Sequence, residues 1–503
     1  MTNPHTQTDD RRIKLAKLRE MGVDPYGGKF EGVTSLATVR RRAEEIGIQP
    51  EQMWSAERFR VAGRIVLLRA FGNLLFLTLR DESGDMQVGL SKKALTNGWP
   101  MTKQLDLGDI IGVDGCLGTT KTAEVTLWGD GLTFLTKALR PPPEKWHGLT
   151  DVELRYRRRY VDLFANPEVR GVFQARGRII QAVRTCLVGQ GFLEVETPML
   201  QAQYGGAAAR PFITHHNTLD MDLYLRISPE LYLKRLLVGG LQRVFEINRN
   251  FRNEGISTRH NPEFTMLEAY QAYGDREDMM SLVENMFAAA IEALDGEYRR
   301  PFGEYTIDYT VPWRRATYAD LLAEHAGVPM RDSKAVRDRA SAMGIDHATM
   351  DDAVVVNELF ERTVEGRLVQ PTFVLDYPAP LCPLTKRRSD DPNTALRFEA
   401  YVACMEIANA YTELNDPDIQ RETFGAQLQG EGDETMRVMD DDFLTALEYG
   451  MPPAGGLGVG IDRMVMLLTG STSIRDVILF PLQRPQARGQ AADSQEPEAE
   501  GRA

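Results

Sequence analysis

Arg252-Asn-Glu-Gly-Ile-Ser-Thr-Arg-His-Asn-Pro-Glu-Phe264 is the stretch around which the rest of the chain is organised. It places two arginines, two glutamates, one histidine and one aromatic ring within thirteen positions, and apolar runs at 243–247 and 264–268 flank it. Arginine presents a fork of donors that fits phosphate, and a phenylalanine ring offers a flat face on which a base can stack. The pattern predicts a strand, a charged loop and a second strand.

Length and charge limit the classes of protein to which this chain can belong. A chain of 503 residues is too long for one ordinary core, so we expect two domains of unequal size. The formal net charge of -13 argues against a surface that binds nucleic acid indiscriminately, although a local basic face is compatible with it.

The cysteines and the apolar runs bear on the compartment. The four cysteines are Cys116, Cys186, Cys382 and Cys404, and neither a CxxC pair nor a zinc-like Cys/His spacing occurs. We therefore expect free thiols in a reducing cytosol. The first ten residues are polar and no run of about eighteen apolar residues occurs, which predicts a cytoplasmic protein without a membrane span.

The first part of the chain predicts a helix followed by a small barrel. Residues 11–21 alternate basic and apolar side chains and end at Gly22, which fits either a solvated helix or a contact with a phosphate backbone. Five short strand-like runs then follow at 60–66, 74–79, 85–90, 109–115 and 124–128. Five short strands separated by turn residues predict an antiparallel barrel of the oligonucleotide-binding type.

One face of such a barrel would suit unpaired bases. Phe76 supplies a ring for stacking, Arg69 a cation and Gln87 an amide that can read a base edge. Phe76 on its own also fits a position in the barrel core, and the pattern alone leaves both readings open.

A proline-rich junction and a basic run follow the barrel. Residues 139–144 read Leu-Arg-Pro-Pro-Pro-Glu, and residues 151–160 are rich in arginine and tyrosine. We interpret them as a hinge, where the basic run is either a solvated surface or a crossing point for a polyanion. A helix at 166–189 and a strand that starts at Gly191 come next, and they either complete the core or form a self-complementary dimer surface.

Three separated segments resemble the motifs of the class II aminoacyl-tRNA synthetases. Gly191-Phe-Leu-Glu-Val-Glu-Thr-Pro198 resembles motif 1, Phe251-Arg-Asn-Glu254 resembles motif 2, and Gly456-Leu-Gly-Val-Gly-Ile-Asp-Arg463 resembles motif 3. They occur in the family's order. A barrel ahead of the catalytic unit is typical of the subgroup for lysine, aspartate and asparagine.

Further segments are similar to the lysine-specific branch of that family. They are residues 227–234, 252–265 and 406–415. The resemblance extends from about residue 10 to residue 485. Residues 486–503 are polar and low in apolar side chains, so we expect a disordered tail there.

The resemblance implies an α+β fold with an oligonucleotide-binding barrel and a catalytic domain built on a six-stranded antiparallel sheet flanked by helices. The expected parts are a helical extension at 1–55, an anticodon-binding barrel at 56–140, a hinge at 141–165 and the catalytic domain at 166–485. The implied partners are ATP, L-lysine, tRNA(Lys) and a second copy of the chain through the motif 1 helix and strand. The barrel would bind the anticodon, with Phe76 stacking on the central base, Gln87 reading its edge and Arg69 assisting.

The implied reaction needs no side-chain nucleophile. The carboxylate of lysine attacks the α-phosphorus of ATP and expels pyrophosphate, and the lysyl group then passes to the 3'-terminal ribose of the tRNA. Positioning and charge neutralisation catalyse such a transfer. The sequence agrees, because it contains neither a Walker Gly-rich loop nor a convincing Ser/His/Asp or Cys/His arrangement.

Family position assigns the nucleotide site. Arg252 would hold the α-phosphate together with the lysine carboxylate, and Arg463 would cover the adenine and contact the γ-phosphate. Arg463 could instead form an ion pair with Asp462 or a nearby acid, and His260 could be a hydrogen-bonding spacer. Glu254 would contact the adenine edge, Phe264 would stack on the adenine, and Arg259 and His260 would contact the terminal phosphates. The full set of residues implied for ATP is Arg252, Glu254, Arg259, His260, Asn261, Phe264, Glu399 and Arg463.

Family position also assigns a Mg²⁺ site to Glu399 and Glu406. Hard Mg²⁺ prefers carboxylate oxygens and water. The spacing alone says little, but the residues between them are largely apolar. We therefore expect both carboxylates to be buried beside a cation.

A lysine pocket must neutralise two ammonium groups, so we expect several carboxylates without balancing basic residues. The resemblance implies Glu230 and the Gly206 carbonyl for the α-ammonium, Glu268, Tyr270 and Glu413 for the ε-ammonium, and Asn409 with Arg252 for the carboxylate.

Three alternatives remain at this stage. An aspartyl or asparaginyl enzyme of the same subgroup would need a different side-chain pocket, with a cation for an aspartate substrate. A ligase that attaches lysine to a protein shares the fold, but such relatives lack the barrel. A binding protein with an inactive site is opposed by the retained Arg252, Glu254, Glu399, Glu406 and Arg463.

Overall fold

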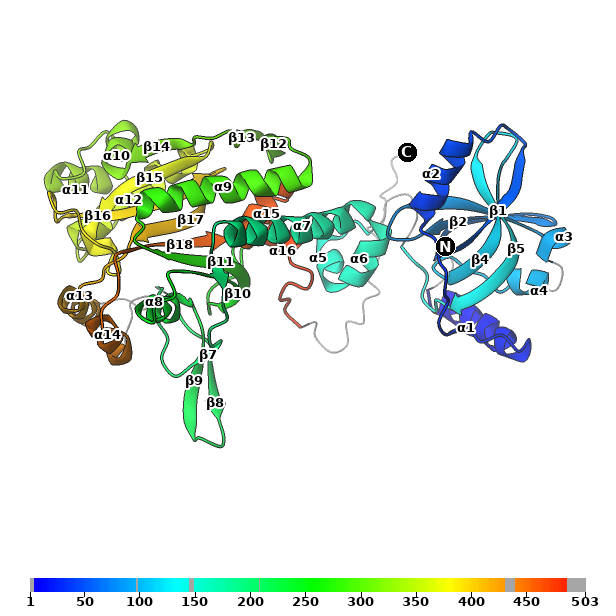
Figure 1. Cartoon of the computed structure of the whole chain (residues 1–503), viewed down its shortest axis with the longest axis horizontal. Helices are drawn as coiled ribbons and strands as arrows, with labels where there is room; N and C mark the ends of the chain where they lie inside the picture. Colours follow the sequence, from blue (N-terminus) through cyan, green and yellow to red (C-terminus); the bar gives the residue numbers. More distant parts are fainter. Residues whose placement is uncertain (1–3, 96–97, 144–148, 208, 430–438, 486–503) are drawn as a thin grey trace, which may run out of the picture. The chain divides into compact units, whose positions relative to one another are not determined.

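The computed structural model describes residues 4–95, 98–143, 149–207, 209–429 and 439–485 (Figure 1). The chain forms two compact units, Met1–Arg155 with Tyr160–Asn166 and Tyr156–Arg159 with Pro167–Ala503. The predicted tail at 486–503 and part of the predicted hinge, residues 144–148, lie outside the described residues.

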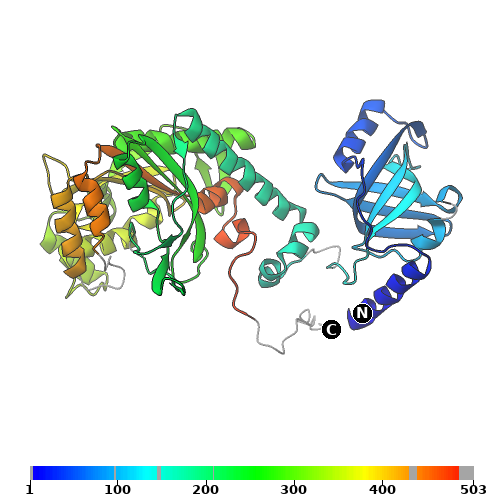
Figure 2. The ribbon, with the colours of Figure 1, turned by 60° about the horizontal axis from the view of Figure 1, so that its bottom comes forward.

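The first unit contains a closed five-stranded barrel in the order β1-β2-β3-β5-β4. Side chains alternate along its strands, so that Leu75, Leu77 and Leu79 of β2 point into the core while Phe76 and Thr78 face outward. The predicted five-stranded barrel is confirmed (Figure 2), but it is not wholly antiparallel, because β3 and β5 pair in parallel. Its elements are β1 (Met53–Phe71), β2 (Leu74–Arg80), β3 (Asp85–Ser91), β4 (Ile110–Thr119), β5 (Val125–Thr136), α3 (Lys92–Leu95) and α4 (Trp99–Thr102).

Two helices precede the barrel, α1 (Pro4–Glu20) and α2 (Leu36–Ile46). The guanidinium of Arg11 donates to the carbonyls of Leu107 and Ala138, both at 2.9 Å. Lys14 forms an ion pair with Asp106 at 2.5 Å. These basic side chains of α1 therefore hold the helix against the barrel.

The second unit is built on an eight-stranded sheet in the order β14-β15-β16-β17-β18-β11-β10-β6. The six strands from β15 to β10 pair antiparallel, and the edge strands β14 and β6 pair in parallel. The predicted six-stranded antiparallel sheet is thus confirmed, with one parallel strand added at each edge. The strands are β6 (Leu193–Glu194), β10 (Arg243–Phe251), β11 (Glu263–Ala272), β14 (Arg314–Thr317), β15 (Thr372–Pro378), β16 (Thr394–Val402), β17 (Met405–Thr412) and β18 (Ala454–Gly460).

Helices pack on one face of this sheet, and the hydrophobic core lies between the helices and the sheet. The predicted helix at 166–189 is α7 (Pro167–Gly189), and its buried positions include Ala175, Ile179, Val183 and Leu187 at intervals of four. It lies beside α9 (Arg276–Leu294), as Figures 1 and 2 show. The predicted strand after Gly191 is much shorter than expected and forms only the two-residue β6.

The remaining elements connect the sheet or extend from it. They are α5 (Val152–Arg157), α6 (Arg159–Ala165), β7 (Leu200–Gln201), β8 (Ile213–His216), β9 (Met221–Leu225), α8 (Glu230–Val238), β12 (Arg299–Phe302), β13 (Tyr305–Asp308), α10 (Tyr318–Ala326), α11 (Ser333–Ala342), α12 (Asp352–Thr363), η2 (Glu365–Arg367), η3 (Ala379–Leu381), α13 (Pro417–Gln429), α14 (Asp441–Glu448), α15 (Ile461–Thr469) and α16 (Ile474–Val477). Within the described ranges, none of the helices combines the length and the apolar composition that crossing a bilayer requires.

Candidate active site

A pocket of about 350 Å³ lies on the sheet face opposite α9, over β10, β11, β17 and β18. Side-chain alternation explains its position, because Leu267 and Ala269 of β11 enter the core while Glu268 and Tyr270 face the pocket. Glu399 and Glu413 do not line it. The predicted residues that do line it are Gly206, Glu230, Arg252, Glu254, Arg259, His260, Asn261, Phe264, Glu268, Tyr270, Glu406, Asn409 and Arg463.

The β10–β11 hairpin places Arg252 and Phe264 together at the base of the charged loop. Asn250 pairs with Phe264 across the hairpin, and the Arg252 amide donates to the Pro262 carbonyl at 2.9 Å. The Arg252 guanidinium lies 5.2 Å from the centre of the Phe264 ring, within cation–π range. The predicted strand, charged loop and strand are confirmed.

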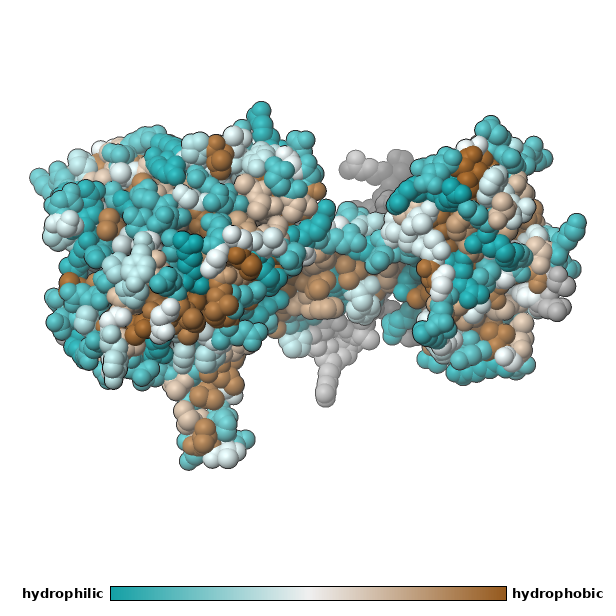
Figure 3. Space-filling model, in the orientation of Figure 1, coloured by the Kyte–Doolittle hydropathy of each residue, from teal (hydrophilic) through white to brown (hydrophobic). Residues whose placement is uncertain are grey.

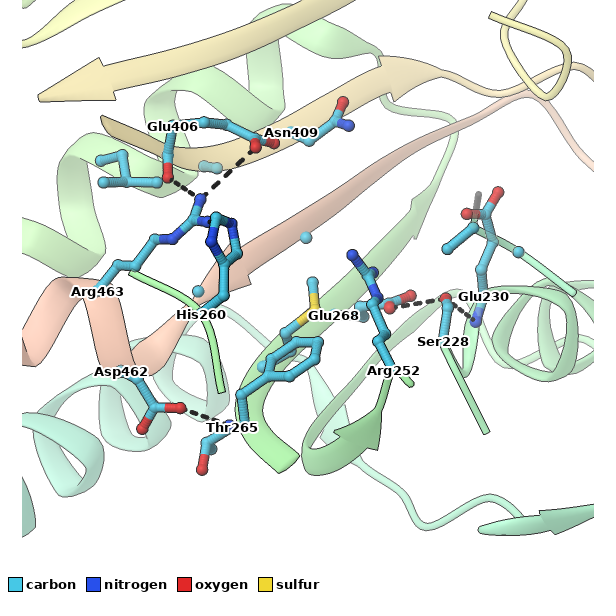
Figure 4. Close-up of a pocket in the computed structure, with 18 of the residues that line it drawn as sticks. Ser228, Glu230, Arg252, His260, Thr265, Glu268, Glu406, Asn409, Asp462 and Arg463 are labelled. Atoms are coloured by element: carbon cyan, nitrogen blue, oxygen red, sulfur yellow. Dashed lines mark hydrogen bonds and ion pairs between the residues drawn. The ribbon is translucent and has the colours of Figure 1, made fainter. Parts of the chain in front are cut away.

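Cationic and imidazole side chains gather at one end of the pocket (Figure 4). One terminal nitrogen of Arg463 donates to the Glu406 carbonyl at 2.5 Å, and the other lies 3.1 Å from His260 Nε2. Arg259 donates to the carbonyl of Cys404 at 2.9 Å. Backbone carbonyls thus hold two arginines at this end, which we call the phosphate end.

His260 lies among positive charges at the phosphate end. Burial, together with the charges of Arg463, Arg259 and Arg252, lowers the pKa of His260. Its Nδ1 lies 2.9 Å from Ser257 Oγ. A neutral ring that donates from Nδ1 to Ser257 can accept from Arg463 at Nε2, so the imidazole orients this arginine without opposing its charge.

Arg463 does not pair with Asp462, but it forms an ion pair with another nearby acid, Glu406, at 3.6 Å, so the alternative of an ion pair is found at Glu406. The Asp462 carboxylate instead forms an ion pair with Arg176 at 2.6 Å and accepts from the Thr265 amide at 2.7 Å. These contacts tie α15 and α7 to β11. They position Arg463 at the rim of the pocket, where Figure 4 shows it pointing toward Glu406.

The other end of the pocket holds buried carboxylates. The carboxylate of Glu230 is 2.7 Å from Lys234 Nζ and accepts from the Tyr411 hydroxyl at 2.7 Å. Glu268 accepts from Ser228 Oγ at 2.9 Å and from the Tyr270 hydroxyl at 3.1 Å. We call this region the acidic end.

Burial perturbs the acids at the acidic end. Burial and the charge of Glu230 raise the pKa of Glu268 to about 8. Burial also raises the pKa of Glu413 to about 8, although Lys234 opposes the shift. A cation that enters beside Glu268 favours its ionised form, so ligand binding and proton release are coupled here.

The prediction of carboxylates without a balancing basic residue is wrong. Lys234 is fully buried and forms ion pairs with both Glu230 and Glu413. Burial disfavours its charge, but the two carboxylates outweigh this effect and raise the pKa of Lys234. The sequence carried a local signal, because Glu230 and Lys234 stand four positions apart on one helix face.

Two glycines allow the backbone to approach these acids closely. Gly206 has φ +85°, and a Cβ there would lie 3.0 Å from Glu230 Cβ and from Ser228 Oγ. A Cβ on Gly456 would lie 1.8 Å from a carboxylate oxygen of Glu413. The Gly-rich strand β18 is therefore required for Glu413 to lie behind the pocket wall.

The two predicted metal ligands have different surroundings. Glu399 forms an ion pair with Arg397 and accepts from the hydroxyls of Tyr377 at 2.9 Å and Tyr401 at 2.7 Å. Glu406 lies on the neighbouring strand, where its pocket environment and the charge of Glu399 raise its pKa. Its side chain is 40% exposed and 3.6 Å from Arg463.

The prediction that both acids are buried beside a cation therefore holds for Glu399 but not for Glu406. The reason is that residues 402–405 form a strand turn, which places the acids on two strands instead of along one. Within the part of the chain that the structure describes, no three His, Cys, Asp or Glu side chains form a metal-binding group.

The pocket and the barrel agree with comparisons to known proteins. The family described as tRNA synthetases class II (D, K and N) matches residues 151–484, and the OB-fold nucleic acid binding domain matches residues 59–135. A lysine-tRNA ligase of Pelotomaculum thermopropionicum is 51% identical over 486 residues, which cover 95% of this chain and 94% of that protein. The chain belongs to the lysine-tRNA ligase family.

Other members of the lysine-tRNA ligase family are similarly close. One from Syntrophomonas wolfei is 50% identical over 484 residues, covering 95% of this chain and 97% of that protein. One from Nostoc sp. is 46% identical over 493 residues, covering 95% of this chain and 87% of that protein. The matches thus cover the barrel as well as the catalytic unit.

In this lysine-tRNA ligase family member, the barrel brings Arg69, Phe76 and Gln87 together in one shallow hollow. Arg69 pairs with Phe76 across β1 and β2, so both side chains lie on the same face. Phe76 lies on this outer face and not in the core, with edge contacts to Phe71 at 6.2 Å and Trp128 at 5.7 Å.

Sequence reasoning missed the residues that support the site. Arg397 donates to the Asn409 amide oxygen at 3.0 Å and also pairs with Glu399. Ser228, Tyr411, Lys234 and Arg176 were missed as well. Arg397 and Glu399 share a strand face two residues apart, which is a readable signal, whereas the other contacts depend on how distant segments meet.

Proposed function

We propose that the protein activates L-lysine with ATP and transfers the lysyl group to tRNA(Lys). The observation that carries this proposal is a pair of buried acids, Glu230 and Glu268, at the end of a pocket whose other end is lined by arginines, with the buried Glu413 behind the pocket wall. An amino acid with two ammonium groups fits the acidic end, and a triphosphate fits the phosphate end. The similarity to lysine-tRNA ligases over nearly the whole chain supports it.

The phosphate end would bind ATP, and Arg252 and Arg463 would be the catalytic residues. Arg252 lies between the two ends, so its guanidinium could hold the α-phosphate and the lysine carboxylate together as negative charge is redistributed. The other proposed ATP contacts are Glu254 at the adenine edge, Phe264 stacked on the adenine, and Arg259, His260 and Asn261 toward the phosphates.

The acidic end would bind lysine. Glu230 and the Gly206 carbonyl would take the α-ammonium, and Asn409 with Arg252 would take the carboxylate. Glu268 and Tyr270, with Glu413 behind the wall, would neutralise the ε-ammonium. The burial of Glu268 and its two hydroxyl donors support this assignment, because an apolar side chain would leave that carboxylate without a counterion.

A Mg²⁺ ion would be held by Glu406 and Glu399 together with the ATP phosphates and water. The residues fit in kind, because Mg²⁺ takes carboxylate oxygens and keeps several waters. Glu406 lines the pocket, whereas Glu399 is already bonded to Arg397, Tyr377 and Tyr401 and would have to turn one oxygen toward the ion. When bound, the ion would neutralise charge on the pyrophosphate leaving group.

The barrel hollow would bind the tRNA anticodon. The exposed face of Phe76 supports stacking on the central base, with Gln87 at the base edge and Arg69 nearby. The proposed division of the chain is an extension at 1–55, the barrel at 56–140, a hinge at 141–165 and the catalytic domain at 166–485.

A second copy of the chain would pack on the motif 1 segment. Exposed apolar side chains gather along the end of α7 and the short strands after it, among them Val188, Leu193 and Leu200. Ile213 extends this surface to the β8–β9 hairpin, whose brown residues are visible in Figure 3. These exposed apolar side chains support a homodimer, and we propose that it acts in the cytoplasm.

Amino-acid-dependent ATP–pyrophosphate exchange tests the function. Each protein amino acid is supplied in turn, and unfractionated tRNA is then charged with the one that reacts. We expect exchange with lysine and charging of tRNA. Exchange with aspartate or asparagine would contradict the lysine assignment, and lysine activation without tRNA charging would indicate a protein acceptor.

A further inference from the structure

Lys234 is a fully buried cation behind the wall of a pocket that we propose to bind a cationic amino acid. Its ammonium lies 2.7 Å from Glu230 and also contacts Glu413, and it is 5.5 Å from the centre of the Tyr411 ring. It comes from α8, whereas Glu413 follows β17. A side-chain ammonium of the protein thus already satisfies two of the three buried acids.

The third buried acid, Glu268, has partners of another kind. Its carboxylate accepts from Ser228 and Tyr270, which are neutral hydroxyls. When Glu230, Glu413 and Glu268 are all ionised, the single positive charge of Lys234 leaves the four side chains with two net negative charges. The two ammonium groups of lysine match these two charges, so the internal cation sets how much positive charge the pocket accepts.

We propose that Lys234 is a positioning residue that determines specificity: its ammonium pairs with Glu230 and Glu413 and holds both carboxyl groups in place, so that Glu268 is the acid left for the substrate's side-chain ammonium. This inference rests on the lysine activation proposed above. Lys234 acts through the two carboxylates and does not contact the reacting atoms.

Replacing Lys234 by methionine keeps the volume and removes the charge. Two neighbouring buried acids without a counterion cannot both stay ionised, so one takes up a proton and the site loses negative charge. We expect Lys234→Met to raise the KM for lysine about a hundredfold at pH 7, with a KM for ATP within threefold of wild type. Raising the pH to 8.5 should recover part of the lysine affinity, because Glu413 and Glu268, whose pKa values are raised to about 8, then ionise more fully.

Arg235 provides a matched control on the same helix. It is the adjacent basic residue of α8, it pairs with Asp440 at 2.9 Å, and it does not line the pocket. Arg235→Gln should leave the KM for lysine within threefold of wild type at both pH values. An equal rise in both variants would indicate a general effect on α8 and would overturn the proposal.

A double-mutant cycle separates positioning from folding. Once Glu413→Gln has removed one acid, the charge of Lys234 matters less, so adding Lys234→Met should change the lysine KM by less than about fivefold. A change of more than tenfold in the Glu413→Gln background would overturn the proposal, and this comparison remains informative if Lys234→Met alone does not fold. Absence of lysine-dependent exchange in the wild-type protein would instead reject the proposed function.

Discussion

The phosphate end and the acidic end of the pocket are built in opposite ways. At the phosphate end, Arg259 donates to one backbone carbonyl, and Arg463 donates to another and also contacts His260 and Glu406. At the acidic end, Glu230 and Glu268 are almost fully buried and bonded to other side chains. One end is a set of fixed charges on the β10–β11 loop and on the first turn of α15, and the other is a closed network of coupled ionisable groups.

The difference in construction suggests different roles: the phosphate end binds a ligand through constant charges, and the acidic end distinguishes one amino acid from another. Arginines stay ionised at any physiological pH, so the phosphate end offers the same charge whether or not ATP is bound. The charge of Glu268 depends on its surroundings, because burial and Glu230 raise its pKa to about 8. A ligand without a side-chain ammonium would leave this acid protonated or unpaired, and we therefore propose that the acidic end selects the amino acid.

Removing Arg252 should affect both ends together and has the largest expected effect. Arg252→Ala should lower the rate of lysine-dependent ATP–pyrophosphate exchange about a thousandfold, because preorganised charge beside the α-phosphate is lost. The melting temperature should stay close to that of wild type. Arg249→Ala is the control, since Arg249 is a partly exposed arginine on β10 outside the pocket. Near-normal exchange by Arg252→Ala would remove Arg252 from its central role.

Neutralising Glu268 should impair lysine binding at the acidic end and leave ATP binding at the phosphate end almost unchanged. Glu268→Gln should raise the KM for lysine about a hundredfold and leave the KM for ATP within a few-fold of wild type. In the wild-type protein, Glu268 is mostly protonated below its pKa of about 8. The KM for lysine should therefore fall as pH rises from 6.5 to 8, by up to about tenfold per unit.

The Glu268→Gln variant supplies the control for this pH dependence, because it has no proton to release at that position. Its lysine KM should vary much less over the same range, and steady-state exchange at a series of pH values measures it. An equally steep dependence in both proteins would place the titrating group elsewhere.

A variant in the barrel should affect neither end of the pocket. Phe76→Ala should reduce kcat/KM for tRNA charging by about tenfold or more, since stacking on one base contributes about 1–3 kcal/mol. Lysine-dependent exchange should be unchanged. Loss of both activities, together with a lower melting temperature, would mean that Phe76 serves mainly to support the barrel.

The smallest expected effect is at the phosphate end. Phe264→Leu removes the ring that faces Arg252 but keeps an apolar side chain. The KM for ATP should rise about threefold to tenfold, in line with a stacking or cation–π contribution of about 1 kcal/mol, and the KM for lysine should not change. A selective rise in the lysine KM would contradict the division of the pocket.

Local sequence patterns predicted the barrel and the β10–β11 hairpin. Arg252 and Phe264 lie on one hairpin, so their approach follows from strand pairing across a short loop. The alternation in β2 likewise places Phe76 on the outer face. These features depend on spacing within a few residues, which a sequence displays directly.

The acidic end depends on contacts that spacing does not reveal. Lys234 contacts Glu413 because α8 and the end of β17 come together beside β18, and no short-range sequence pattern predicts this contact. The difference between Glu399 and Glu406 also arises from the strand turn between them, which places one acid among tyrosines and the other at the pocket. Long-range side-chain pairs therefore account for most of what the sequence left out.

The central claim is that buried carboxylates select the amino acid by its side-chain charge. ATP–pyrophosphate exchange with L-lysine and with norleucine, which lacks the ε-ammonium, tests it most directly. We expect robust exchange with lysine and negligible exchange with norleucine at the same concentration, because norleucine leaves Glu268 without a counterion. Comparable rates with the two amino acids would contradict it.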